Sequence, residues 1–135
     1  MTKESKLKRV QQFIATPFLG LGAWCLLHPA SVERLSLQAE YQHLSTTSAL
    51  LIGCFGAQAI LAGLLVLFTT FTRRTFLVFG IALLPFLAFN YAFVFVWPIF
   101  TSWMALDLAG NLLMLGLCAI GWRLASHDTI AAGRE

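Results

Sequence analysis

The sequence predicts an all-α integral membrane protein, a four-helix bundle joined by short antiparallel hairpins. Two observations carry this prediction. Hydrophobic residues make up 59% of the chain and charged residues 11%, whereas soluble domains have about 45–50% apolar and about 25% charged residues. The apolar residues also gather in four long runs. These runs are too continuously apolar for the alternation that a membrane-spanning β-barrel requires, so helices are expected.

The four runs have the length that a bilayer demands. A hydrocarbon core of about 30 Å needs about 20 helical residues. The expected spans cover residues 10–27, 49–71, 75–98 and 103–122 of one 135-residue domain. Only a few residues connect the second, third and fourth spans, so these three are expected to pack as antiparallel neighbours.

Basic residues divide unequally between the two sides that these spans define. Eight of the nine fall before the first span, between the second and third, or after the fourth, and only Arg34 falls on the opposite side. Basic residues in short loops are retained in the cytoplasm, so both termini are predicted to be cytoplasmic. The eight residues are Lys3, Lys6, Lys8, Arg9, Arg73, Arg74, Arg123 and Arg134.

The first run also has the outline of a cleaved signal peptide, with basic residues before an apolar stretch. Cleavage after Ala30 would place His28 where a small side chain is needed. Trp24 is too large for the position before Cys25 in a lipoprotein cleavage site. We therefore expect the first helix to be retained, and the other three spans stand on either interpretation.

The segment 28–47 is the longest connection and is expected on the outer surface of the membrane. Pro29 is expected to end the first helix and Ser31 to cap a short second one. Its apolar side chains would face one way and its polar side chains would face water: Glu33, Arg34 and Gln38.

Pairs of small residues four positions apart let helices approach closely in a membrane. The sequence contains three such pairs: Thr16 and Gly20, Gly53 and Ala57, and Ala59 and Gly63. We favour contacts within the chain over a homo-oligomer interface, which remains the alternative.

Residues that commonly catalyse reactions or bind metals form no recognisable pattern. The three Cys lack a C-x-x-C pair, and the three His (His28, His43 and His127) lie outside the predicted spans. No metal site and no cofactor are predicted. The scattered basic residues disfavour nucleic acid as a partner, and the common nucleotide-binding and nucleophile motifs are absent.

Four polar side chains inside the spans are the candidate functional residues. At 1.5 Å per residue, three of them lie about 12–15 Å below the outer ends of their helices. The fourth, Asp107, lies one turn from Asn111 on the same helix face. An unpaired polar group in lipid costs a few kcal/mol, so we expect the four to point inward and meet: Gln58, Asn90, Asp107 and Asn111.

Two interpretations of this group remain open. In the first, it supplies hydrogen bonds that join the helices. In the second, it forms the floor of a cavity in the outer half of the bundle, which would bind a lipid, quinone or isoprenoid. The expected aromatic walls are Phe86, Phe93 and Trp97.

An enzyme is disfavoured because acid–base chemistry usually pairs two titratable groups. Asp107 is the only acidic residue within a predicted span, and no His or Lys accompanies it. Completion of a site by Glu33, Glu40 and His43 from the outer segment stays open.

Two stretches carry a resemblance to known proteins. They are Leu26-Leu27-His28-Pro29 followed by Val32 and Leu35, and Leu50-Leu51-Ile52-Gly53-Cys54-Phe55-Gly56-Ala57-Gln58 followed by Gly63. In them the chain resembles the small four-helix membrane proteins of bacteria that are broadly similar to the DoxX-like families. This resemblance implies a four-helix bundle in the bacterial cytoplasmic (inner) membrane and implies no catalytic residue.

The sequence therefore predicts a multi-pass protein in contact with the lipid bilayer. Its expected function is that of a non-enzymatic accessory or interaction module with a membrane protein partner. The alternative is a protein that binds or modifies an amphiphilic ligand.

Overall fold

The computed structural model describes residues 2–125, and this part of the chain is almost wholly helical. His127 and Arg134 lie outside the described residues. The helices in chain order are α1 (Lys3–Leu27), α2 (Pro29–Ser36), the 3-10 turn η1 (Ala39–Tyr41), α3 (Thr46–Phe68), α4 (Arg73–Tyr91), the π-helical turn η2 (Ala92–Val96) and α5 (Met104–Ala125).

Four helical stretches are long and apolar enough to cross a membrane: Glu4–Leu27, Thr46–Phe68, Arg73–Val96 and Met104–Ala125. The all-α class with four helices of spanning length is therefore confirmed. The first spanning helix, α1, begins earlier than expected. The second spanning helix, α3, lies about three residues nearer the N-terminus than expected.

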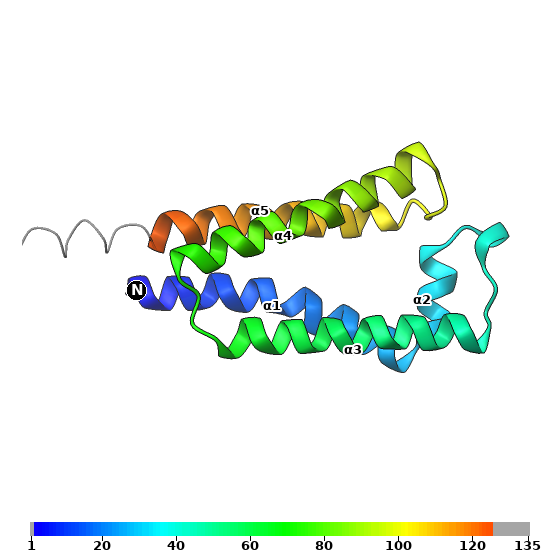
Figure 1. The fold of residues 1–135 in the computed structure, drawn as a ribbon, viewed down its shortest axis with the longest axis horizontal. Coiled ribbons are helices and arrows are strands. Elements are labelled where there is room, and N and C mark those ends of the chain that lie inside the picture. The colour runs from blue at the N-terminus through cyan, green and yellow to red at the C-terminus, as the bar shows by residue number, and fades with distance from the viewer. Residues whose placement is uncertain (1, 126–135) are drawn as a thin grey trace, which may run out of the picture.

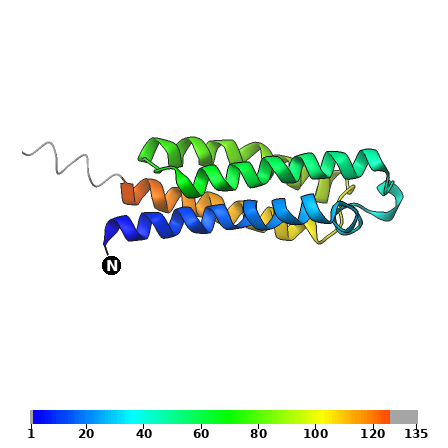
Figure 2. The same cartoon turned by 90° about the horizontal axis from the view of Figure 1, so that it is seen from below.

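The helices pair as α1 with α3 and α4 with α5, and α1 also contacts α5 (Figures 1 and 2). The expectation that α3 packs beside α4 is wrong. These two helices are consecutive and antiparallel, but each packs mainly against a different helix. The two pairs lie close together at the end where α1 begins, which we call the terminal end. They diverge toward the opposite end, which we call the α2 end (Figure 1).

Small residues explain why α3 pairs with α1. A Cβ added to Gly56 would lie 2.6 Å from the carbonyl oxygen of Gly22, so the two backbones touch. Gly63 is buried against the side chains of Leu19 and Phe18 of α1. The predicted contact within the chain is confirmed for Ala59 and Gly63, which are both buried.

The other two predicted pairs do not make this contact. Thr16, Gly20 and Ala57 are exposed, and nothing lies within 4 Å of a Cβ placed on Gly20. No other helix in the described chain therefore packs closely on Thr16, Gly20 or Ala57.

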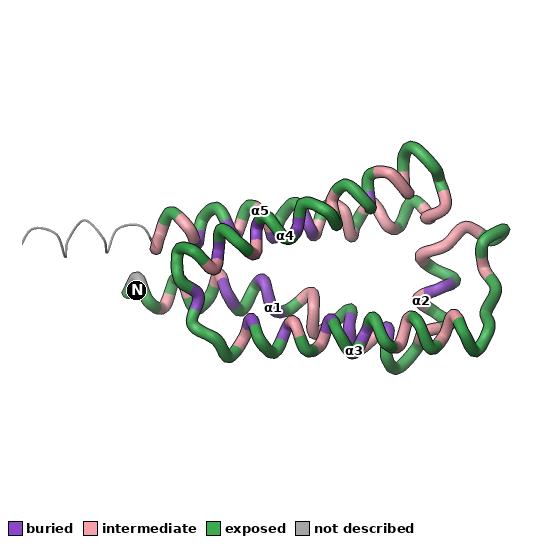
Figure 3. Tube along the Cα trace, viewed as in Figure 1, coloured by how far each residue is buried: buried purple, intermediate pink, exposed green. Residues whose placement is uncertain are grey.

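An apolar core fills the terminal end, where α1, α3, α4 and α5 all contribute buried positions (Figure 3). Its centre is Phe76, which is 1% exposed and packs edge-to-face on Phe71 with ring centroids 5.1 Å apart. Nearby, the Arg73 guanidinium carbon lies 4.3 Å from the centroid of the Trp122 ring. The remaining core residues come from all four long helices: Ile14, Ala15, Val66, Leu83, Met114 and Cys118.

Hydroxyl side chains fix the starts of α3 and α4. The Ser45 hydroxyl accepts a hydrogen bond from the Ser48 amide at 3.1 Å, and the Ser48 hydroxyl accepts one from the Ser45 amide at 3.0 Å. Thr72 and Thr75 form the same reciprocal capping box at α4. Such boxes satisfy amide groups that a helix leaves unpaired at its start. They therefore place the boundaries at Ser45 and Thr72.

Candidate functional site

The candidate site is a cluster of one carboxylate and two amides at the junction of α4 and α5. Asp107 lies in the first turn of α5, where the partial positive charge of the helix end favours an acidic side chain. Asn111 follows one turn later on the same face. Asn90 lies in the last turn of α4, which runs antiparallel to α5. The chain returns through η2 and residues 97–103, and the antiparallel direction of α5 places Asp107 beside Asn90.

Three hydrogen bonds hold this cluster together. Asn90 Nδ2 donates to Asp107 Oδ2 at 2.6 Å. Asn111 Nδ2 donates to the same Oδ2 at 3.1 Å and to the Asp107 carbonyl oxygen at 2.9 Å. Asn90 is 3% exposed and Asn111 is 6% exposed. The predicted hydrogen-bonded cluster of these three residues is therefore confirmed.

Gln58 does not join the cluster and is exposed on α3. The face of α3 that packs on α1 runs through Gly56, Ala59 and Gly63. A residue next to Ala59 is rotated by about 100° around the helix, because an α-helix has about 3.6 residues per turn. Gln58 therefore points away from that interface. The expectation that it turns inward to meet the other three is wrong.

Of the expected aromatic walls, Phe93 and Trp97 belong to one group of rings around Phe93, and Phe86 has no ring contact in it. Its ring centroid lies 6.3 Å from that of Trp97, 4.6 Å from that of Phe89 and 5.7 Å from that of Phe100. Phe86 is 51% exposed. The wider turn of η2, in which the Trp97 amide bonds the Ala92 carbonyl at 2.8 Å, changes the register that a regular helix would give. Trp97 is 62% exposed as a result.

One oxygen of the Asp107 carboxylate remains accessible. Oδ2 accepts both side-chain hydrogen bonds, whereas Oδ1 has none in the described structure. No buried side-chain oxygen or nitrogen in residues 2–125 lacks a partner, so Oδ1 is not enclosed. The cluster can therefore join α4 to α5 and still accept one further hydrogen bond.

No group of His, Cys, Asp and Glu in the described part of the chain has the arrangement of a metal site. No Lys, His or second carboxylate bonds Asp107 there. The three side chains supply hydrogen-bond donors and acceptors to one another.

Glu33 is buried, and the expectation that it faces water is wrong. Its Oε1 accepts hydrogen bonds from the amides of His43 at 2.7 Å and Leu44 at 2.9 Å. Its Oε2 accepts one from the Ser48 hydroxyl at 2.6 Å. Glu33 is 2% exposed because these three donors replace water around the carboxylate.

The donors also change the acidity of Glu33. The Ser48 hydroxyl and the Leu44 and His43 amides stabilise the charged form and lower the pKa of the carboxyl from its usual value. The amides of His43 and Leu44 are consecutive and both point to Oε1, an arrangement of backbone N–H groups that binds an anionic oxygen. Sequence reasoning missed this site because the donors are backbone amides of a distant loop.

The expectation that Ser31 caps α2 is wrong, because α2 begins at Pro29 and Ser31 lies within its first turn.

Gln11 is the second buried polar residue that sequence reasoning missed. Its Nε2 donates to the carbonyl oxygens of Val66 and Thr69. Carbonyls in the last turn of a helix have no partner within the helix. Gln11 therefore caps the end of α3 from α1 and joins the two helices at the terminal end.

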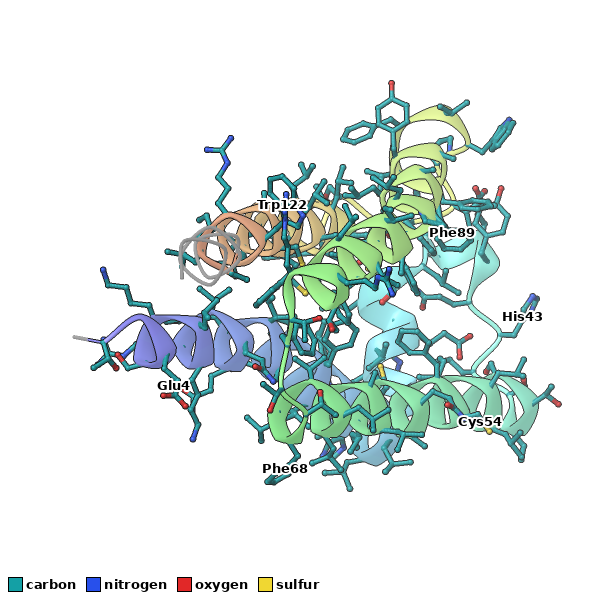
Figure 4. The ribbon with its side chains drawn as sticks, turned by 60° about the vertical axis from the view of Figure 1, so that its left-hand side comes forward. Glu4, His43, Cys54, Phe68, Phe89 and Trp122 are labelled. Carbon is teal, nitrogen blue, oxygen red and sulfur yellow. The ribbon has the colours of Figure 1, made fainter. Side chains whose placement is uncertain are left out.

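The cysteines make no disulfide in the described structure. Cys25 and Cys118 are buried, whereas Cys54 points away from the bundle, as does Phe68 on the same helix (Figure 4). This arrangement agrees with small apolar side chains used in packing or facing the surroundings.

No family model matches the chain, and no curated protein and no solved structure matches it either. The resemblance to DoxX-like proteins therefore stays a prediction.

Proposed function

We propose that this chain is a multi-pass protein of the bacterial cytoplasmic membrane that serves as a non-enzymatic accessory or interaction module. The observation that carries the proposal is the cluster of Asn90, Asp107 and Asn111. In α3, α4 and α5 the sequence has one carboxylate, and its bonds go to two amides that cannot titrate. Such a group joins helices and offers no acid–base pair for catalysis.

The surface of the long helices supports insertion in a membrane. Large apolar side chains are exposed along α3, α4 and α5, and a soluble monomer rarely exposes contiguous apolar patches above a few hundred Å². Examples are Phe55 at 55%, Ile81 at 56% and Leu113 at 67% exposure. Lipid chains and the helices of a partner are the surroundings that match this surface.

The distribution of charge supports cytoplasmic termini. The start of α1 and the connection between α3 and α4 lie at the terminal end (Figure 1), and both carry basic residues. Arg34 is the basic residue of the α2 end. We propose that the terminal end faces the cytoplasm, following the retention of basic loops on that side.

Replacing Asn111 by Leu tests the role of the cluster. If the group joins α4 to α5, the variant loses on the order of 1 kcal/mol of stability, measured by denaturant titration of the detergent-solubilised protein. Gln58→Leu is the matched control because Gln58 is exposed and lies outside the cluster, and we expect it to leave stability unchanged. Equal stability of both variants would contradict the proposal.

Native mass spectrometry of the gently extracted protein tests the interaction role. A membrane protein that co-purifies in a fixed ratio supports an accessory module. A small amphiphile retained in a fixed ratio, with no protein partner, contradicts it.

The accessible Oδ1 of Asp107 favours a second candidate function. In this candidate, the polar head of a lipid, quinone or isoprenoid donates a hydrogen bond to Oδ1, and the rings around Phe93 contact its apolar part. Asp107→Asn and Asn90→Leu would then abolish retention of the amphiphile with little loss of stability. Retention by both variants would rule this candidate out.

A further inference from the structure

A recess of about 570 Å³ lies in the angle between the end of α1 and α2, lined by residues 27–31 together with Arg34 and Leu35. It is separate from the cluster around Asp107. His28 ends α1, and Pro29 begins α2 after a change in chain direction. The sharp turn leaves an open angle between two helices, and this angle forms the recess.

Side-chain hydrogen bonds fix the wall of the recess. Trp24 Nε1 donates to the Ser31 hydroxyl at 2.8 Å, and that hydroxyl donates to the His28 carbonyl at 2.8 Å. These bonds tie the first turn of α2 back to the last turn of α1. The recess is therefore a formed feature of the bundle and does not depend on a bound molecule.

The recess combines an apolar floor with one cation. Leu27 is 70% exposed and Leu35 is 39% exposed, so both offer apolar surface. Arg34 supplies the charge. Its neighbour Glu33 bonds to His43, Leu44 and Ser48, so both carboxylate oxygens of Glu33 are occupied and neither is directed to Arg34.

The position of the recess matches the boundary between hydrocarbon and water. It begins where the apolar stretch Glu4–Leu27 ends, and Trp24, a residue type enriched at this boundary, lies one turn before it. An Arg side chain there can keep its guanidinium at the level of lipid headgroups while its stem lies along apolar surface. Guanidinium groups bind phosphate oxygens through paired N–H donors.

We propose that this recess binds the phosphate-bearing head of an anionic membrane lipid. Arg34 contacts the phosphate, and Leu27 and Leu35 contact the first carbons of the acyl chains. The inference rests on the membrane insertion proposed above and is independent of the role of the Asp107 cluster. The required chemistry is an anionic phosphate, which a lipid head or a free phosphate ester could supply.

The test measures lipid bound to the purified protein by native mass spectrometry, with phosphatidylglycerol and phosphatidylcholine offered in equal amounts. The intact protein should retain phosphatidylglycerol in preference. One basic residue near an anionic surface contributes about a fivefold effect on binding, so Arg34→Gln should lower retention about fivefold and Arg34→Lys should restore part of it. Arg74→Gln, an exposed basic residue at the terminal end, is the matched control and should change nothing.

A second variant keeps the charge and fills the space. Ala30 is exposed and lines the recess, so Ala30→Trp should also displace phosphatidylglycerol. Competition with glycerol phosphate, which has no acyl chains, distinguishes a lipid headgroup from a free phosphate ester as the ligand. Displacement of the lipid by millimolar glycerol phosphate would show that the recess recognises a free phosphate ester and would overturn the lipid assignment.

Equal retention of the two lipids by the intact protein, or equal phosphatidylglycerol retention by Arg34→Gln, would overturn the proposal. Resistance of the chain to carbonate extraction from membranes separates the two levels of failure. A chain released by carbonate contradicts membrane insertion. A chain that stays in the membrane but shows no preference contradicts only the lipid site.

Discussion

The backbones of α1 and α3 touch at Gly56, where one added methyl group is expected to force the helices apart. A Cβ at Gly56 would lie 2.6 Å from the Gly22 carbonyl oxygen and 2.8 Å from the Leu26 amide nitrogen. Both are backbone atoms, so neither can rotate away. Ordinary contact begins at 3.4 Å, so Gly56→Ala requires the two helices to separate by about 0.8 Å there.

The magnitude follows from that separation. A gap of about 0.5–1 Å forfeits about a quarter to a half of the attraction of each atom pair, and overpacked substitutions typically cost about 1–3 kcal/mol. Alanine has a higher helix propensity than glycine by about 1 kcal/mol, which offsets part of this loss. We expect Gly56→Ala to lower the free energy of unfolding by up to about 2 kcal/mol.

The assay is reversible unfolding in mixed micelles with increasing dodecyl sulfate, followed by circular dichroism. Gly20→Ala is the matched control, because it adds the same methyl to α1 at a position with nothing within 4 Å. We expect it to be neutral or slightly stabilising. If Gly56→Ala and Gly20→Ala unfold at the same denaturant concentration, the α1–α3 contact described above is wrong.

Three further outcomes are expected. Gly121→Ala, whose Cβ would overlap the buried ring of Phe76, should destabilise the α4–α5 pair by up to about 2 kcal/mol after the gain in helix propensity. Gly116→Ala has nothing within 4 Å of its Cβ and should not destabilise the pair, and equal melting temperatures of the two variants would refute the packing. The folded-state pKa of Glu33 lies below its unfolded value. Its contribution to the free energy of unfolding is therefore present above about pH 4.3 and is lost as the pH falls through the folded pKa. Glu33→Gln should remove this part of the pH dependence of stability, measured by unfolding the protein at a series of pH values. An unchanged pH profile in the variant would contradict the role of Glu33. Reporter fusions should read cytoplasmic after Arg74 and external near Gln42, and a cytoplasmic signal at Gln42 would reverse the proposed topology.

The helices were predictable because each apolar run is long, and length with composition is enough to identify a spanning helix. Which helices pack together was not predictable. Several small residues lie on α3, and the contacts of Gly56 with Gly22 and of Gly63 with Leu19 show that α1 is the partner. The short connection between α3 and α4 makes these helices antiparallel, but it does not determine which helix packs against each of them.

The candidate site was predictable where one helix turn set the geometry. Asp107 and Asn111 share a face because they are four residues apart, and Asn90 reaches them because α4 and α5 run antiparallel. Gln58 has a similar depth but a different rotation, which an apolar sequence does not reveal. Glu33 was missed because its amide donors come from the loop before α3.

The two ends of the bundle are held together by different forces. At the terminal end, apolar side chains from all four long helices meet. At the α2 end, the connections supply hydrogen bonds. The backbone amide of Gln38 donates to the Ile99 carbonyl at 3.0 Å, and the backbone amide of Thr101 donates to the Ser36 carbonyl at 2.9 Å.

These bonds join the segment after α2 to the connection between α4 and α5, where the two helix pairs diverge. Leu37 and Phe100 form an antiparallel bridge at the same place, and Gln38 Nε2 donates to the Pro98 carbonyl at 3.0 Å. Backbone groups outside helices and closed barrels are not tolerated against lipid. This end is therefore suited to the water-facing side of the membrane, and Arg34 with its recess belongs to the same layer.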